Sequence, residues 1–177
     1  MRLRNHISAV VIFILAVMVC DARMAAAQTD EGIMVGATAP AIVLSDLAGK
    51  SVRLGPGERG GLRVAQPTLI EFWATWCEFC ERLEPRMRAA FSKFGTRVQF
   101  AAIAVNVNQS LSRVIRHVHD RTLAYPVYYD VSGAATRAFD VAATSFVVVL
   151  DRSGKVVYTG VGDQQDLEAA IRRALSS

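Results

Sequence analysis

Two cysteines three positions apart stand where an apolar run gives way to a pattern with helical spacing. The apolar run covers residues 67–73 and is typical of a buried strand, and Cys77 and Cys80 follow it. A helix that begins at such a pair places backbone N–H groups without partners near the first sulfur. Those groups and the helix dipole favour thiolate over thiol. The spacing also lets the two sulfurs close into a small, reducible disulfide ring, so the segment predicts redox chemistry.

Other roles for the Cys77–Cys80 pair need partners that the sequence lacks. A structural zinc site needs four ligands, and no second cysteine pair is present. Covalent haem attachment would need a histidine at position 81, where Glu81 stands. Transfer of copper through the two thiolates stays open as an alternative, although no Met-rich or His-rich tract accompanies them. For the redox function we expect no metal and no other cofactor.

The N-terminus is predicted to be a targeting segment. Arg2 and Arg4 precede an apolar stretch over residues 7–19, and three alanines at 25–27 suit cleavage by a signal peptidase. The stretch is shorter than the about 20 residues that span a bilayer. We therefore expect cleavage, with a retained membrane anchor as the alternative. The chain then divides into a signal peptide (1–27), a loose leader (28–35) and one domain (36–177).

Cleavage changes what the composition implies. It removes three arginines, one aspartate and Cys20, so the net charge falls from +4 to +2 and two cysteines remain. A single close pair in an exported protein indicates a working redox pair rather than a disulfide scaffold. The small charge, without basic residues interleaved with aromatics, argues against nucleic acid as a partner.

Apolar runs that alternate with helical patterns predict an α/β domain with a mixed sheet. Strands are expected at residues 41–44, 51–54, 67–73, 98–105, 126–129, 146–150 and 156–161. Helices are expected at residues 77–94, 111–118, 132–139 and 165–175. The first two strands should form a hairpin around Gly49, and Asp163 is the expected N-cap of the last helix.

At this point the chain resembles the exported TlpA/ResA group of thiol–disulfide oxidoreductases, which have the thioredoxin fold. The resemblance rests on the string Phe72-Trp73-Ala74-Thr75-Trp76-Cys77 with Cys80, on Pro85, and on the segments 36–40, 105–108, 125–127 and 151–157. It implies a mixed central sheet flanked by helices, with an N-terminal β-hairpin extension.

The resemblance also implies an activity, a location and partners. The protein would reduce disulfides of other exported proteins in the periplasm, cytochrome c apoproteins among them, either free or tethered to the membrane. Cys77 would attack the substrate disulfide and Cys80 would resolve the mixed disulfide. A membrane-linked thiol reductant would have to resupply the electrons. A redox-inactive binding module of the same fold is a third reading, against which both retained cysteines argue.

Glu71 and Trp76 are candidate site residues near the pair. Glu71 stands six residues before Cys77 in an otherwise apolar strand. It is either a surface residue on an alternating strand or a buried acid beneath the cysteines, where thioredoxins carry an aspartate. A buried carboxyl has a raised pKa and can exchange a proton with Cys80. Trp76 is expected to border the exposed sulfur and to contact substrate.

The chain departs from the group at a position that usually holds a cis-proline. Ser145 occupies it, preceded by Thr144 and six residues before Asp151, which follows the predicted strand. A cis bond before a residue other than proline costs roughly 2.5–4 kcal/mol. We expect this loop to stay close to Cys77, with Thr144 and Ser145 in contact with substrate.

A second departure concerns an acid that the group tends to carry two residues before the helix proline. Leu83 stands there, and the following Glu84 is expected to pair with Arg88 one helical turn on. His117 and His119 lie two apart on a predicted helix and are expected on a solvated face rather than in a metal site.

Overall fold

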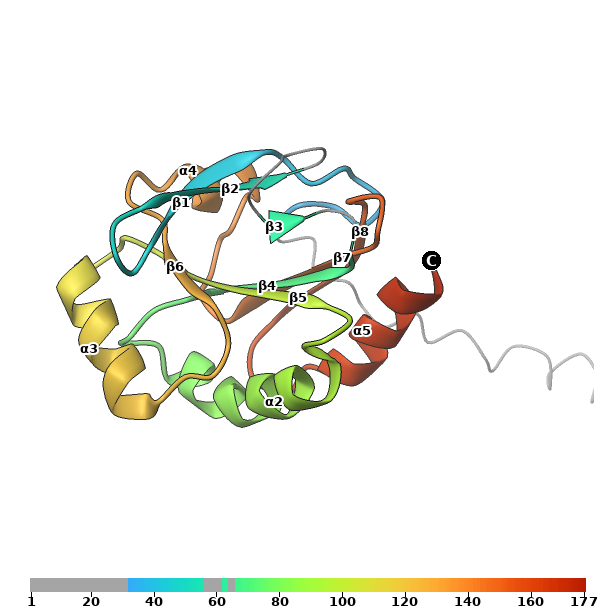
Figure 1. Cartoon of the computed structure of the whole chain (residues 1–177). Helices are drawn as coiled ribbons and strands as arrows, with labels where there is room; N and C mark the ends of the chain where they lie inside the picture. Colours follow the sequence, from blue (N-terminus) through green and yellow to red (C-terminus); the bar gives the residue numbers. More distant parts are fainter. Residues whose placement is uncertain (1–31, 56–61, 64–65) are drawn as a thin grey trace, which may run out of the picture.

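A mixed sheet organises the part of the chain that the structure, a computed structural model, describes: residues 32–55, 62–63 and 66–177 (Figure 1). The strands are β1 (Ile42–Asp46), β2 (Ser51–Gly55), β3 (Leu62–Arg63), β4 (Thr68–Trp73), β5 (Gln99–Ala104), β6 (Val127–Tyr129), β7 (Phe146–Leu150) and β8 (Val156–Val161). The helices are α2 (Glu78–Phe94), α3 (Leu111–Arg121), α4 (Ala134–Ala138) and α5 (Leu167–Ser176).

The strand order is β3-β2-β1-β6-β5-β4-β7-β8. β4, β5 and β6 are parallel, because each is joined to the next by a crossover helix, first α2 and then α3. β7 and β8 complete one side of the sheet as an antiparallel pair beside β4. The β1–β2 hairpin pairs antiparallel with β6 on the other side. The predicted fold, a thioredoxin-type mixed sheet with an N-terminal hairpin, is confirmed.

The core lies around the two strands at the middle of the domain, β4 and β7, in which every residue is buried. Except for Thr68 and Glu71 in β4, their residues are apolar, because helices cover both faces of the sheet. Figure 1 shows α2 and α5 on one face and α4 on the other. β4 therefore directs the chain from the centre of the sheet straight into the start of α2.

Helix α2 begins and ends where the sequence pattern predicts. Cys77 is its N-cap and Gly95 its C-cap, and the buried stripe includes Cys80, Leu83 and Phe94. The N-cap residue has extended backbone angles, φ −90° and ψ 108°, which suit a side chain that accepts a hydrogen bond from the first turn.

The last helix starts later than predicted, and Asp163 is not its cap. Asp166 Oδ1 accepts a hydrogen bond from the N–H of Ala169 at 2.9 Å, so Asp166 is the N-cap. Asp163 instead accepts from Arg82 Nε at 2.8 Å. Gln165 between them is buried and donates to two loop carbonyls, which holds this stretch outside the helix.

The described part of the predicted leader is bound to the domain. The N–H of Ile33 donates to the carbonyl of Phe139 at 2.9 Å, and the N–H of Gly36 donates to Val156 at 2.7 Å. The predicted signal peptide lies outside the described residues. Within them, no helix has both the length and the apolar character required to cross a membrane.

Candidate active site

Cys77 and Cys80 form a disulfide at the N-terminus of α2, with their Cα atoms 5.3 Å apart. Cys77 Sγ accepts a hydrogen bond from the N–H of Cys80 at 3.0 Å. This N–H belongs to the first turn of the helix, whose donors have no intrahelical acceptor. The contact predicted from the spacing is therefore present: a helix-terminal donor points at the first sulfur, where it stabilises negative charge.

In the disulfide, the exposed fractions of the two cysteines differ only slightly. Cys77 is 9% exposed and Cys80 is 6% exposed. The difference between them lies in hydrogen bonding, because the donor of the first turn points at Cys77. The prediction that Cys77 is the more reactive thiol rests on that contact.

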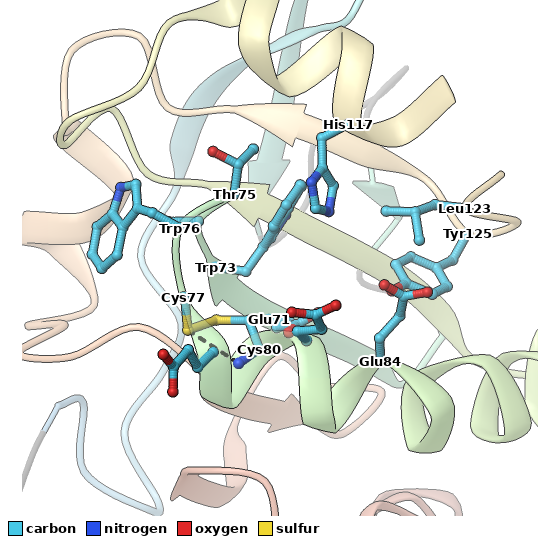
Figure 2. Close-up of a pocket in the computed structure, with 13 residues that line it drawn as sticks. Glu71, Trp73, Thr75, Trp76, Cys77, Cys80, Glu84, His117, Leu123 and Tyr125 are labelled. Atoms are coloured by element: carbon cyan, nitrogen blue, oxygen red, sulfur yellow. Dashed lines mark hydrogen bonds between the residues drawn. A yellow bond between two sulfur atoms is a disulfide. The ribbon is translucent and has the colours of Figure 1, made fainter. Parts of the chain in front are cut away.

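A cavity of about 140 Å³ lies beside the disulfide (Figure 2). β4 supplies its inner wall, the start of α2 supplies one side, and α3 with the following loop supplies the other. Polar and aromatic side chains line it together with the cysteines: Glu71, Trp73, Thr75, Trp76, Glu78, Glu81, Glu84, His117 and Tyr125. The cavity thus brings His117, Leu123 and Tyr125 to the segment that runs from β4 into α2 and carries the sulfur pair.

Glu71 is the buried acid of this cavity, and the surface interpretation is wrong. It is 3% exposed because β4 pairs with β5 on one side and β7 on the other. Burial raises the pKa of the Glu71 carboxyl from its ordinary value of 4.5 to about 8, with a smaller contribution from the negative charge of Glu84. The carboxyl is thus mostly protonated at neutral pH.

Glu84 lies on the same cavity wall, held by two arginines. The predicted pair with Arg88 is confirmed, with Arg88 Nη2 2.8 Å from Glu84 Oε1. Arg121, from the end of α3, adds a contact of 3.0 Å between its Nη2 and Glu84 Oε2. Arg121 Nη1 also lies 2.9 Å from Glu81 Oε1. These contacts join α2 to α3 over the cavity.

Trp73 and Trp76 occupy different places. Trp73 is 4% exposed, and within the described part of the chain its indole N–H is buried without a hydrogen-bond partner. Trp76 is 43% exposed at the cavity mouth, and its Nε1 donates to the carbonyl of Val107 at 2.9 Å. Trp76 therefore borders the disulfide with a fixed orientation.

The expectation of a solvated face is confirmed for His119 and wrong for His117. The His119 side chain is 88% exposed. The His117 ring packs against Trp73, with ring centroids 5.3 Å apart, and lines the cavity. Burial, followed by the charge of Arg121, lowers the pKa of His117. The reason is helical geometry: residues two apart point in different directions, and only His117 faces the sheet.

Thr144 and Ser145 do not line the cavity. Ser145 is fully buried, its Oγ donates to the carbonyl of Gly162 at 3.0 Å, and its own carbonyl accepts from Gln165 Nε2 at 3.0 Å. The described chain contains no cis peptide bond, and Ser145 has a left-handed φ of +62°. The serine hydroxyl is thus used within the loop, and substrate contact through these two residues stays a prediction.

Sequence reasoning missed several residues at the cavity or next to it. His117 was expected on a solvated face, Tyr125 belonged only to a family motif, and Arg121, which contacts Glu84 beside the cavity, had no signal. They follow Glu84 by more than 30 residues, and only the crossover from β5 through α3 to β6 returns the chain to the cavity. No local pattern signals such a contact.

A thioredoxin fold whose central strand leads into a disulfide at a helix N-terminus, above a buried acid, defines a thioredoxin-like protein disulfide oxidoreductase. The chain belongs to the Redoxin family, whose model matches residues 34–175, and it is of the TlpA/ResA type. The resemblance to the TlpA/ResA group is therefore confirmed over almost the whole described domain.

Relatives and solved structures agree with this placement. The thiol-disulfide oxidoreductase ResA of Geobacillus thermodenitrificans is 30% identical over 141 residues, which cover 77% of this chain and 75% of the relative. ResA of Bacillus subtilis is 30% identical over 132 residues, covering 75% and 70%. A Neisseria meningitidis structure described as a thioredoxin has a TM-score of 0.67 at 27% identity, covering 78% of this chain and 90% of its own. A Chlorobium tepidum structure described as the thiol:disulfide interchange protein DsbE has a TM-score of 0.69 at 23% identity, covering 81% and 97%, and shares the fold.

Proposed function

We propose that this oxidoreductase works in the periplasm and reduces disulfides of other exported proteins, cytochrome c apoproteins among them. The observation that best supports disulfide exchange at Cys77 is the hydrogen bond from the Cys80 N–H to Cys77 Sγ, beside the buried Glu71. The predicted signal segment supports export, and the TlpA/ResA resemblance supports the reducing direction.

The reaction passes two electrons from the dithiol to the substrate. The Cys77 thiolate attacks one sulfur of the substrate disulfide, forms a mixed disulfide, and releases the other substrate sulfur as a thiolate. Cys80 then loses its proton and attacks Cys77 Sγ, which releases the second substrate thiolate and leaves the Cys77–Cys80 disulfide. A membrane-linked thiol reductant would return the protein to the dithiol form.

Glu71 in its ionised form, the minor form at neutral pH, is the proposed proton acceptor for Cys80 in the second step. Both residues line the cavity, on facing parts of β4 and α2 (Figure 2). Burial raises the pKa of Glu71 to about 8, so the carboxyl can take up and release a proton around neutral pH. A group that titrates near the working pH is suited to general acid–base catalysis.

The reduction potential of the protein tests the direction. Equilibration in glutathione or dithiothreitol buffers, followed by alkylation of free thiols, gives the potential of the Cys77–Cys80 couple. We expect a value below about −200 mV, whereas a value near −120 mV would mark an oxidant and refute the reducing role.

Copper delivery is the alternative use of the two thiolates. In residues 32–55, 62–63 and 66–177, no group of three or more His, Cys, Asp or Glu side chains is arranged to hold a metal ion. Any copper site would thus rest on Cys77 and Cys80 alone. Titration of the reduced protein with Cu(I), run beside a disulfide turnover assay, separates the two functions.

A further inference from the structure

An exposed aromatic ring lies between the two cysteines and is not used by the chemistry described above. Phe79 is 53% exposed, and Trp76, on the other side of Cys77 in sequence, is 43% exposed. Val107, whose carbonyl accepts the Trp76 indole N–H, is 50% exposed. Cys77 itself is 9% exposed, and the two exposed rings lie one residue before it and two residues after it in the sequence.

Contacts from outside the Cys77–Cys80 segment hold the Phe79 ring in place. The guanidinium carbon of Arg82 lies 4.5 Å from the ring centroid, a cation–π distance. Arg82 Nε in turn donates to Asp163 Oδ2 at 2.8 Å, and that hydrogen bond lowers the pKa of Asp163. Asp163 follows Gly162, whose carbonyl accepts from Ser145 Oγ. The loop between β8 and α5 therefore anchors the ring.

An exposed ring fixed in this way is preorganised for binding, because little side-chain freedom is lost when a partner covers it. A protein disulfide has to bring one sulfur to bonding distance of Cys77. Because Trp76 and Phe79 are exposed within two residues of Cys77, the residues beside the partner's cysteine come close to these rings. Apolar side chains at those partner positions bury surface against the two rings, whereas polar side chains would lose water without gaining a hydrogen bond.

We propose that Phe79, held by Arg82 and Asp163, is a specificity-determining residue that selects protein disulfides with a bulky apolar side chain next to the reacting cysteine. This inference rests on the disulfide exchange at Cys77 and holds for either direction of electron flow. The occupant of the surface is thus a cysteine-bearing segment of a partner protein, bound while the mixed disulfide exists.

Paired peptides test the inference. Two disulfide peptides, identical except for leucine or serine beside the cysteine, are mixed with the reduced protein, and the second-order rate constants of disulfide exchange are compared. We expect a preference of about 10-fold for the leucine peptide, the discrimination typical of one small apolar contact. Phe79→Ala should bring the ratio of the two rate constants close to one. Each ratio comes from one protein, so a changed reduction potential cancels.

Arg82→Gln and Val43→Ala complete the set of variants. Arg82→Gln keeps the Phe79 ring but removes the positive charge over it. We expect this variant to have a ratio of rate constants between those of the wild type and Phe79→Ala. Val43→Ala is the matched control: Val43 is 50% exposed on β1, outside the cavity, and its removal should leave the wild-type ratio unchanged.

Three outcomes would overturn the inference: no preference in the wild type, an unchanged ratio in Phe79→Ala, or a dimer in sedimentation that this substitution disperses. The last would assign the rings to a second copy of the chain. An oxidising potential would refute the proposed direction only, because the same ratio can then be measured with dithiol peptides and the oxidised protein.

Discussion

Replacing Glu71 by glutamine removes a carboxyl group that lies wholly inside the protein. In the unfolded chain this group ionises around its ordinary pKa of 4.5, whereas in the folded protein its pKa is about 8. Between these values the folded state binds a proton that the unfolded state has released. Stability is therefore lost as pH rises from about 4.5 to about 8.

The size of this loss follows from the interval between the two pKa values. The whole interval corresponds to about 5 kcal/mol, and at pH 7 about 3 kcal/mol of it has already been lost. Glutamine resembles the protonated carboxyl in shape and does not ionise. We therefore expect Glu71→Gln to be more stable than the wild type by about 3 kcal/mol at pH 7 and by less than about 1 kcal/mol at pH 5.

Urea unfolding of the oxidised protein at pH 5, 6, 7 and 8 measures the difference. Glu78→Gln is the matched control, because the Glu78 side chain is 87% exposed and its removal should produce no such pH-dependent gain. If wild type and Glu71→Gln show parallel stability curves, Glu71 is not a buried titrating acid and the reasoning fails. In disulfide turnover we expect the reverse effect, a slower resolving step near neutral pH, because glutamine cannot accept the Cys80 proton.

Three further predictions follow from single contacts. Brief alkylation of the reduced protein at neutral pH, with peptide mapping, should label Cys77 first, because the helix N-terminus stabilises its thiolate; preferential labelling of Cys80 would contradict this. Arg121→Met should raise the pKa of Glu71 further, because it leaves the negative charge of Glu84 less compensated. Infrared titration of the carboxyl band measures this pKa, and a lower pKa in the variant would contradict the prediction. Ser145→Pro should destabilise the fold by more than about 1 kcal/mol in urea unfolding, because proline cannot adopt a φ of +62°. Ser145→Gly should destabilise it much less, because glycine adopts positive φ readily. Equal stabilities of the two variants would mean that the loop adapts freely to proline.

The elements that sequence reasoning located are those whose patterns are local. β7 and β8 were predicted with the boundaries that the structure shows, because each is an apolar run bounded by turn residues. α2 was located because its buried stripe recurs every three or four residues and Gly95 ends it. α5 was misplaced at its start because Asp163 and Asp166 are equally good N-caps by composition. Only the contact between Asp163 and Arg82 decides between them.

For the site, the sequence by itself determined the sulfur pair, its place at a helix N-terminus and the presence of an acid six residues earlier. These depend on spacing along a strand and a helix, which neighbouring residues define. The tertiary structure decided whether Glu71 is buried, because β5 and β7 have to pair on both sides of β4 before water is excluded. It also decided the electrostatic surroundings of Glu71, since Arg121 and His117 reach the cavity only when α3 packs against α2 and the sheet. A pKa depends on burial and on charges close in space, and these distances follow from strand order rather than from local sequence.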